Sequence, residues 1–309
     1  MYKKILFAII AISILAISCN KDETTDDTGP KLIFKFKFDS TQARLNAFAR
    51  PSTIPDGNWG QSPVFHAMSA HFIQLAEDSL SPLTTNVLYR NNEVTTGGDN
   101  AIDFSKSVIK KEGEIFYSVP LKNLTQGTYK WLRISLAYQN YDVKAIYRRN
   151  DVNGGNPITF DGEVVSFLGF NSYVTSYSIK GENITVNGNL PQGSGAVKPY
   201  NIPFISTLPA IKWTAAANTS TTVVNPFRVQ LGIPSNSCLV TAPFTTPISI
   251  TGNETSDIVV TVSLSTNKSF EWKDRNGDKL FEPVDGNNSN APLDSVVDMG
   301  IRGMRPIVN

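Results

Sequence analysis

The chain has 309 residues, with 28 Lys and Arg against 27 Asp and Glu, so its formal net charge at pH 7 is +1. This balance gives no electrostatic basis for binding nucleic acid, and we expect no nucleic-acid partner. Hydrophobic residues make up 40% of the chain and charged residues 18%. Together with frequent Ser, Thr, Asn and Gly, this mixture is typical of an extracellular β-protein with many turns.

The first 18 residues have the composition of a secretory signal peptide. Lys3 and Lys4 precede an apolar run of 13 residues from Ile5 to Ile17. A helix needs about 20 residues to cross a bilayer core, so this run is too short for a transmembrane span. A charged start, a short apolar core and a small residue such as Ser18 mark a cleavable signal. We therefore predict that residues 1–18 are removed.

A cysteine follows the signal directly. Leu15, Ala16 and Ser18 lead into Cys19. The stretch resembles the lipobox of Bacteroidota-type outer-membrane lipoproteins, although Leu15 stands four residues before Cys19 rather than three. The resemblance implies that Cys19 becomes the acylated first residue, which gives stable membrane anchoring when several acyl chains are present. The alternative is an ordinary signal peptide with an incidental cysteine.

The residues after Cys19 carry a second resemblance. Lys21, Asp22 and Glu23 resemble the Lys-acidic-acidic export tag of surface lipoproteins in the same bacteria. The resemblance implies a lipid-anchored protein displayed outside the outer membrane, with an extracellular ligand or protein partner of unknown identity. The alternative is a solvated acidic tether. Residues 19–30 are expected to form a flexible tether in either case, because 22–30 contain no apolar side chain to bury.

Residues 31–309 are predicted to form an all-β domain. In the segment 31–38, Leu32, Phe34, Phe36 and Phe38 share one face and Lys35 and Lys37 the other, and this period of two indicates a strand. Further strand-like stretches cover 65–76, 114–119, 129–138, 164–179, 247–250 and 257–265. No long amphipathic helix is evident. Many short strands with Gly, Pro and Asn turns predict an antiparallel β-sandwich with long loops, of jelly-roll or immunoglobulin-like type.

Two segments interrupt this pattern. The clearest break is 148–157, with Asn153-Gly154-Gly155-Asn156, and a subdivision into two domains near 150–157 stays open. The stretch 187–217 is rich in Pro and Gly and only weakly periodic. So long a stretch without structure is uncommon inside a compact domain. It predicts a lid, a wrapping arm or a set of short edge strands.

The sharpest chemical motif lies at residues 274–285. Calcium prefers six to eight oxygen ligands, which alternating Asp and Asn residues can supply around one centre. The segment resembles the twelve-residue calcium loop of EF-hand and dockerin-type sites. The resemblance implies that the ligands come from six residues, with Leu280 contributing its carbonyl, and that Phe281 packs inward. These ligands are Asp274, Asn276, Asp278, Leu280, Glu282 and Asp285.

The same motif departs from the calcium-loop pattern. Lys279 stands where the loop usually has a Gly, at the point where a left-handed backbone is easiest for Gly. Pro283 follows, and no flanking helix is predicted. The alternative is an Asn-Gly hairpin turn that joins a strand at 270–272 to one at 280–281. A bound calcium would serve a structural role.

The two histidines of the chain offer another metal hypothesis. His66 and Met68 share one face of the predicted strand, so a copper site formed by His66, Met68 and His71 is conceivable. The histidines, five residues apart, lie on opposite faces of a strand, which disfavours a local chelate. The alternative is a hydrogen-bonded His71 within an apolar face and a His66 at the surface.

Enzyme signatures are missing from the sequence. There is no G-x-S-x-G elbow, no H-E-x-x-H and no phosphate-binding glycine loop. We therefore expect a non-catalytic protein, with a hydrolase that uses dispersed carboxylates as a further alternative. Cys238 has no partner for a disulfide once Cys19 is acylated, and we predict a buried, inert thiol.

A band of aromatic residues completes the candidates. Its members lie at strand spacing between residues 138 and 177, and we expect most of them in the core. Part of the band could form a platform that stacks on a ligand. The band comprises Tyr138, Tyr141, Tyr147, Phe167, Phe170, Tyr173 and Tyr177. The sequence as a whole predicts a surface lipoprotein that binds an extracellular ligand or partner.

Overall fold

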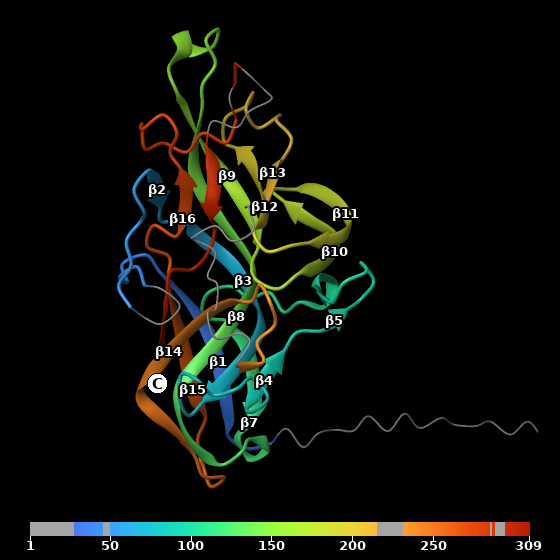
Figure 1. Cartoon of the computed structure of the whole chain (residues 1–309), viewed down its shortest axis with the longest axis vertical. Coiled ribbons are helices and arrows are strands. Elements are labelled where there is room, and N and C mark those ends of the chain that lie inside the picture. The colour runs from blue at the N-terminus through green and yellow to red at the C-terminus, as the bar shows by residue number, and fades with distance from the viewer. Residues whose placement is uncertain (1–27, 46–49, 215–230, 285, 288–293) are drawn as a thin grey trace, which may run out of the picture.

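The computed structural model is all-β, as the alternating sequence predicts (Figure 1). It describes residues 28–45, 50–214, 231–284, 286–287 and 294–309. The helical segments whose bounds lie within these residues are three single turns of 3₁₀ helix: η1 (Phe104–Lys106), η2 (Leu121–Asn123) and η3 (Asn153–Gly155).

A seven-stranded sheet forms the centre of the molecule. Its longest strand, β8 (Gly127–Tyr147), pairs with β3 (Val64–Ala76) along one edge. Along its other edge, β8 pairs first with β14 (Cys238–Ile250) and then with β9 (Ile158–Phe167). The remaining strands are β4 (Val87–Arg90), β12 (Ser194–Tyr200) and β13 (Ile211–Thr214). Strand β13 therefore forms one edge of this sheet and β4 the other.

A second sheet packs against the first and confirms the β-sandwich. It has the order β18-β15-β1-β7, and its central pair β1–β15 is parallel. The buried residues Phe34 of β1 and Val262 of β15 belong to the same core as Leu132 and Ile134 of β8. The alternation of apolar and polar residues in the N-terminal strand therefore sets which face is buried. Its strands are β1 (Lys31–Asp39), β7 (Ile115–Pro120), β15 (Ile258–Ser265) and β18 (Met304–Val308).

A third sheet, with the order β11-β10-β6-β5, builds a second core. Here Val174 and Ile184 of the third sheet pack with Val165, Phe167 and Ala196 of the central sheet. The third sheet contains β5 (Glu93–Val94), β6 (Ala101–Asp103), β10 (Ser172–Ile179) and β11 (Glu182–Leu190). A fourth sheet contains β2 (Asn58–Gln61), β16 (Phe270–Lys273) and β17 (Ser295–Asp298).

The two interrupted segments have distinct structures. Residues 148–157 connect β8 to β9, which pair antiparallel from Tyr147 and Ile158 onward, so one sheet continues through this break. The described part of 187–217 contains the end of β11 together with β12 and β13, which are short strands at or near a sheet edge. Of the three possibilities for this stretch, the structure thus has the short edge strands.

Cys238 begins β14 and is buried, as predicted. Burial raises the pKa of its thiol to about 12, because the thiolate would lose its hydration. A thiol that stays protonated at neutral pH is a poor nucleophile and a poor metal ligand.

Candidate functional site

The predicted anchor and export residues Cys19, Lys21, Asp22 and Glu23 lie outside the described residues, as does the last predicted calcium ligand, Asp285. In the part of the chain that the structure describes, no helix has the length and apolar character to span a membrane.

The structure separates the two histidines of the copper hypothesis. His66 Nε2 lies 2.9 Å from Asp142 Oδ2, and 42% of the His66 side chain is exposed. His71 is fully buried, and its Nε2 lies 2.9 Å from Glu93 Oε1. Five residues along a strand span about 16 Å. With Met68 buried between them on the same strand, His66, Met68 and His71 have separate surroundings and share no centre.

The buried histidine and its carboxylate form a structural pair. The His71 ring stacks on Phe170 at 4.8 Å between centroids, and burial lowers the pKa of His71. The hydrogen bond from His71, with further donors on Arg90 and Asn100, lowers the pKa of Glu93 to about 2. The structure therefore agrees with the second interpretation of the histidines, in which His71 is buried and hydrogen-bonded and His66 lies at the surface.

The loop at 274–285 follows β16 but is not a hairpin turn. Strand β16 pairs with β2 and β17, and residues 280–281 are not in a strand, which makes the hairpin hypothesis wrong. A hairpin requires the two arms to pair with each other, but here the aromatic ring of Phe281 is buried against Phe270 and Trp272 instead. The inward packing of Phe281 agrees with the calcium-loop pattern.

One backbone angle of this loop agrees with the calcium pattern. Lys279 adopts a φ of +66°, the left-handed conformation that the usual Gly provides at this position. The Lys279 amide donates to Asp274 Oδ2 at 3.0 Å, and its ammonium lies 4.7 Å from the centre of the Trp59 ring. These contacts offset the roughly 1–2 kcal/mol that a non-Gly residue loses in this conformation. Asp274 Oδ2 accepts this hydrogen bond with one lone pair and keeps a second lone pair that can bind a cation.

The charges around the loop are partly balanced within the protein. Arg148 Nη2 lies 3.0 Å from Asp278 Oδ2, and Arg148 Nη1 lies 3.6 Å from Glu282 Oε2. The buried Asp294 accepts hydrogen bonds from the amides of Arg275 and Glu282.

Asp294 is the residue that sequence reasoning missed here, since it lies beyond the twelve-residue motif. Burial, together with the like charges of Asp274 and Asp278, raises the pKa of Asp294 to about 6. Across the described residues, no group of three or more His, Cys, Asp and Glu side chains is arranged to hold a metal ion. The carboxylates of the loop are therefore held by amides and by Arg148 in this structure.

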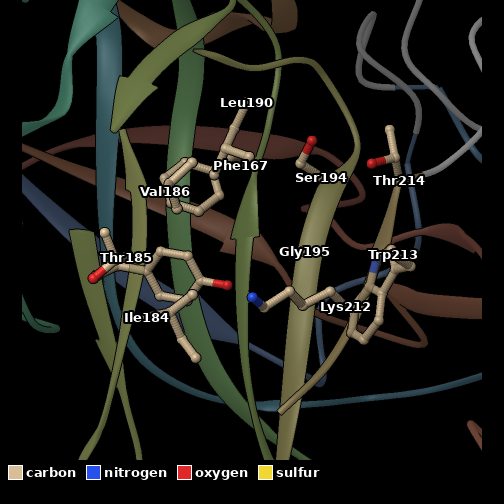
Figure 2. A pocket seen from close by; sticks show the side chains of 11 residues that line it. Phe167, Ile184, Thr185, Val186, Leu190, Ser194, Gly195, Lys212, Trp213 and Thr214 are labelled. Atoms are coloured by element: carbon tan, nitrogen blue, oxygen red, sulfur yellow. The ribbon is translucent and has the colours of Figure 1, made fainter. Parts of the chain in front are cut away.

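A cleft of about 520 Å³ opens between the third sheet and the edge of the central sheet. Figure 2 shows side chains of β11 on one side of it and side chains of β13 on the other, with Phe167 and Ser194 between them. Most of its lining is aromatic or aliphatic, which is usual for a ligand site of this size. The lining residues are Phe167, Tyr177, Ile184, Thr185, Val186, Leu190, Ser194, Gly195, Lys212, Trp213 and Thr214.

A glycine on the neighbouring strand determines where the Trp213 ring lies. A Cβ at Gly195 would come within 2.9 Å of the Trp213 ring and of Met299 Sδ, so only Gly leaves room for the indole. The indole Nε1 donates to Met299 Sδ at 2.7 Å, while the Trp213 side chain stays partly exposed. The ring is therefore held in one orientation and is still accessible from the cleft.

Ser194 is a polar exception in this mostly apolar cleft. The residue is 3% exposed, and its Oγ has no hydrogen-bond partner among the described residues. An unsatisfied buried hydroxyl costs about 1–3 kcal/mol. Other buried serines, such as Ser69 and Ser135, also lack a partner among the described residues, and Ser194 is the one of them that lines the cleft. The charged residue Lys212 is exposed at the rim, and its neighbour Glu182 is already ion-paired with Lys198 at 2.9 Å.

The aromatic band divides between core and cleft. Tyr138, Tyr141 and Tyr147 are buried in the two cores, as expected for most of the band. Phe167 and Tyr177 also line the cleft, and burial raises the pKa of the Tyr177 hydroxyl. Sequence reasoning missed Trp213 and Ser194, because both lie in the Pro- and Gly-rich stretch that has no clear periodicity.

We compared the chain with protein-family models, curated proteins and solved structures. No protein-family model, no curated protein and no solved structure matches the chain significantly.

Proposed function

We propose that the protein is a non-catalytic lipoprotein, anchored in the outer membrane through acylated Cys19 and displayed at the cell surface. It binds an extracellular ligand in the cleft between β11 and β13. The lipobox-like stretch and the tag at 21–23 support the location, and the lack of catalytic motifs supports a binding role. The cleft itself, with the partly exposed Trp213 ring held against Gly195 and with the buried Ser194 in its lining, is the observation that carries the binding proposal.

The dispersed-carboxylate hydrolase finds little support in the cleft. Among its described lining residues there is no Asp, Glu or His to act as an acid, base or nucleophile. The buried carboxylates Glu271 and Asp298 lie elsewhere and are ion-paired with Arg44 and Arg302. Such buried pairs stabilise or specify a fold and are not poised for proton transfer.

Ligand binding is tested on the mature lipoprotein in detergent micelles. The probes are a pool of random octapeptides, a panel of neutral and acidic oligosaccharides, and a set of apolar small molecules. We expect at least one class to slow hydrogen exchange in β11–β13 of the wild type and of the control Phe204→Ala, whose ring is 46% exposed outside the cleft. Trp213→Ala should lose this protection. Protection by no class, or chemical conversion of a probe, would contradict the proposal.

The anchor is tested by fractionation and surface proteolysis. Cys19→Ala should move the protein out of the membrane fraction, while the control Cys238→Ala stays anchored. Replacement of Lys21, Asp22 and Glu23 by Ala should keep the protein in the membrane but protect it from protease added to intact cells. A Cys19→Ala protein that remains membrane-bound would remove the anchor from the proposal.

We also propose a structural calcium ion in the loop at 274–285. The left-handed Lys279, at the position of the usual Gly, is the observation that favours it. Asp274, Asn276, Asp278 and Glu282 would supply oxygens, with Asp285 completing the set, and calcium would brace the loop against β16. Calcium should raise the thermal midpoint of the wild type and leave Asp274→Ala unchanged. Equal midpoints in calcium and in chelator would reject the site.

A further inference from the structure

We infer that the ligand of the cleft is an extended peptide, which binds by adding a strand along the open edge of β13, in the cleft that β11 borders on its other side. This inference rests on the proposed function, because it names the ligand class for the same cleft. Its observations are the unpaired strand edges, the order of the lining residues and the chemistry of their side chains.

Both strands that border the cleft are edge strands in the described part of the chain. Strand β13 pairs only with β12, and β11 pairs only with β10. An edge strand presents a row of N–H and C=O groups that another chain can bind. Natural proteins commonly use such edges to bind extended peptides.

The order of the lining residues shows that the cleft follows these edges. Three successive residues of β11, Ile184–Val186, and three of β13, 212–214, border the same space. Successive side chains of a strand point to opposite faces of the sheet. Three successive residues of one strand therefore border the same cleft when the cleft runs along the edge of that strand. At such an edge a ligand meets the backbone of the strand.

The dimensions fit a short stretch of peptide. With about 3.3 Å per residue, the three lining residues of β13 span roughly 7–10 Å, which matches three or four residues of an added strand. The cleft volume of about 520 Å³ leaves room for side chains beyond this backbone.

The side chains of the cleft favour one apolar or aromatic anchor residue. Phe167 and Tyr177 are nearly buried at its base, and the partly exposed Leu190 and Trp213 stand at its sides. Ser194 also lines the cleft, and its hydroxyl, which is buried from solvent and has no partner among the described residues, can bond a peptide group only after a local shift of the lining. The exposed Lys212 at the rim favours an acidic residue beside the anchor, worth about 1 kcal/mol or less at the surface.

The same lining argues against a sugar as the preferred ligand. None of the described lining residues is an Asp, Glu, Asn or Gln, so the cleft offers no carboxylate or amide side chain for a row of sugar hydroxyls. A peptide satisfies most of its polar groups through the backbone of the edge strand instead.

The test selects a peptide and then removes its backbone donors. A phage-displayed library of random octapeptides is selected on the wild-type lipoprotein in micelles, with counter-selection on Trp213→Ala. The selected peptide is synthesised with a fluorophore, and its Kd is measured by anisotropy. We expect N-methylation at alternate positions to weaken binding at least tenfold, because every second N–H of an added strand bonds to the edge.

Matched variants place the peptide in the cleft. Trp213→Ala and Gly195→Ala should each weaken binding at least tenfold, the second because its new methyl displaces the indole. Phe204→Ala and the exposed Ser178→Ala should change Kd by less than twofold. Urea unfolding of each variant verifies that it is folded, and Gly195→Ala serves as the second test should Trp213→Ala be unstable.

Four outcomes separate this inference from the proposed function. A selected peptide with the alternating N-methyl pattern supports both. A peptide that tolerates N-methylation at every position overturns strand addition and leaves the cleft as a binding site. Binding of oligosaccharides or apolar compounds alone overturns the peptide and leaves the proposed function. Binding by none of these probes overturns both.

Discussion

The loop at 274–285 and the cleft between β11 and β13 satisfy their polar groups in opposite ways. In the loop, backbone amides and Arg148 already hold Asp274, Asp278 and Asp294. In the cleft, the buried Ser194 hydroxyl has no partner among the described residues. A calcium ion in the loop would therefore compete with Arg148 for the loop carboxylates, whereas a ligand of the cleft would supply a hydrogen bond that the protein itself does not provide. This difference is the basis on which we propose a structural role for the loop and a ligand-binding role for the cleft.

The largest expected effect is a loss of stability in the loop region alone. Phe281 is 2% exposed and packs on Phe270 and Trp272, so Phe281→Ala should lower the free energy of unfolding by about 3–5 kcal/mol. Urea unfolding measures this change, and the neighbouring Leu280→Ala, at 41% exposure, should stay within about 0.5 kcal/mol. Ligand affinity of the folded Phe281→Ala protein should not change. A lower ligand affinity in this variant would show that the loop and the cleft are coupled.

Acid should also affect stability without affecting the cleft. The pKa of Glu93 is about 2 in the folded protein against an ordinary value of 4.5, so its stabilisation is present above pH 4.5 and is lost as the pH falls toward 2. The loss is at most about 3 kcal/mol, and the protonation of the buried His71 acts in the same direction. Unfolding free energies measured from pH 7 to pH 2.5 should fall, and Glu93→Gln should flatten the curve below pH 4.5.

The cleft provides the control for this pH series. Its described lining holds only Tyr177 and Lys212 as titratable side chains. Ligand affinity should therefore be constant between pH 4.5 and 8 while the protein is folded. An affinity that falls together with the unfolding free energy as the pH is lowered over this range would couple the cleft to the buried His71–Glu93 pair and contradict this expectation.

A smaller effect is expected at Arg148, which balances the loop carboxylates. Arg148→Ala removes ion pairs to Asp278 and Glu282 and should cost about 1–2 kcal/mol in chelator, since Arg148 is 30% exposed. Calcium should restore the thermal midpoint and bind this variant more tightly than the wild type, because it no longer competes with a guanidinium. Arg149→Ala, which loses an exposed pair with Asp151 and no ion pair to the described loop carboxylates, should behave like the wild type. Absence of any calcium response in Arg148→Ala would argue strongly against the loop as a calcium site.

Much of the fold could be predicted from local periodicity. The alternation in β1 correctly placed Phe34 and Phe36 in the core. The predicted strand at 164–179 proved to be two strands in different sheets, β9 and β10, because Gly169 turns the chain with a φ of +67°. A Cβ there would lie 2.5 Å from the Cys238 amide nitrogen, a contact that no sequence pattern reveals.

The candidate site depended more on tertiary structure. Phe167 and Tyr177 were recognisable as members of an aromatic band, but Trp213 stands on a four-residue strand that is too short to show a period. Ser194 shares a buried hydroxyl without a described partner with other serines, such as Ser69 and Ser135, and only its place in the lining of the cleft sets it apart. Asp294 joins the loop from outside its motif, so spacing could not identify it.

The most direct test of the central claim is a paired measurement on Ser194→Ala. Removing an unsatisfied hydroxyl should leave the free energy of unfolding unchanged or raise it by up to about 1 kcal/mol in the ligand-free protein. The same change should weaken the selected ligand by up to about tenfold, because one hydrogen bond is lost from the complex. The exposed Ser178→Ala should alter neither quantity. A Ser194→Ala protein that is less stable and binds the ligand as tightly as the wild type would contradict the claim that the cleft is completed by its ligand.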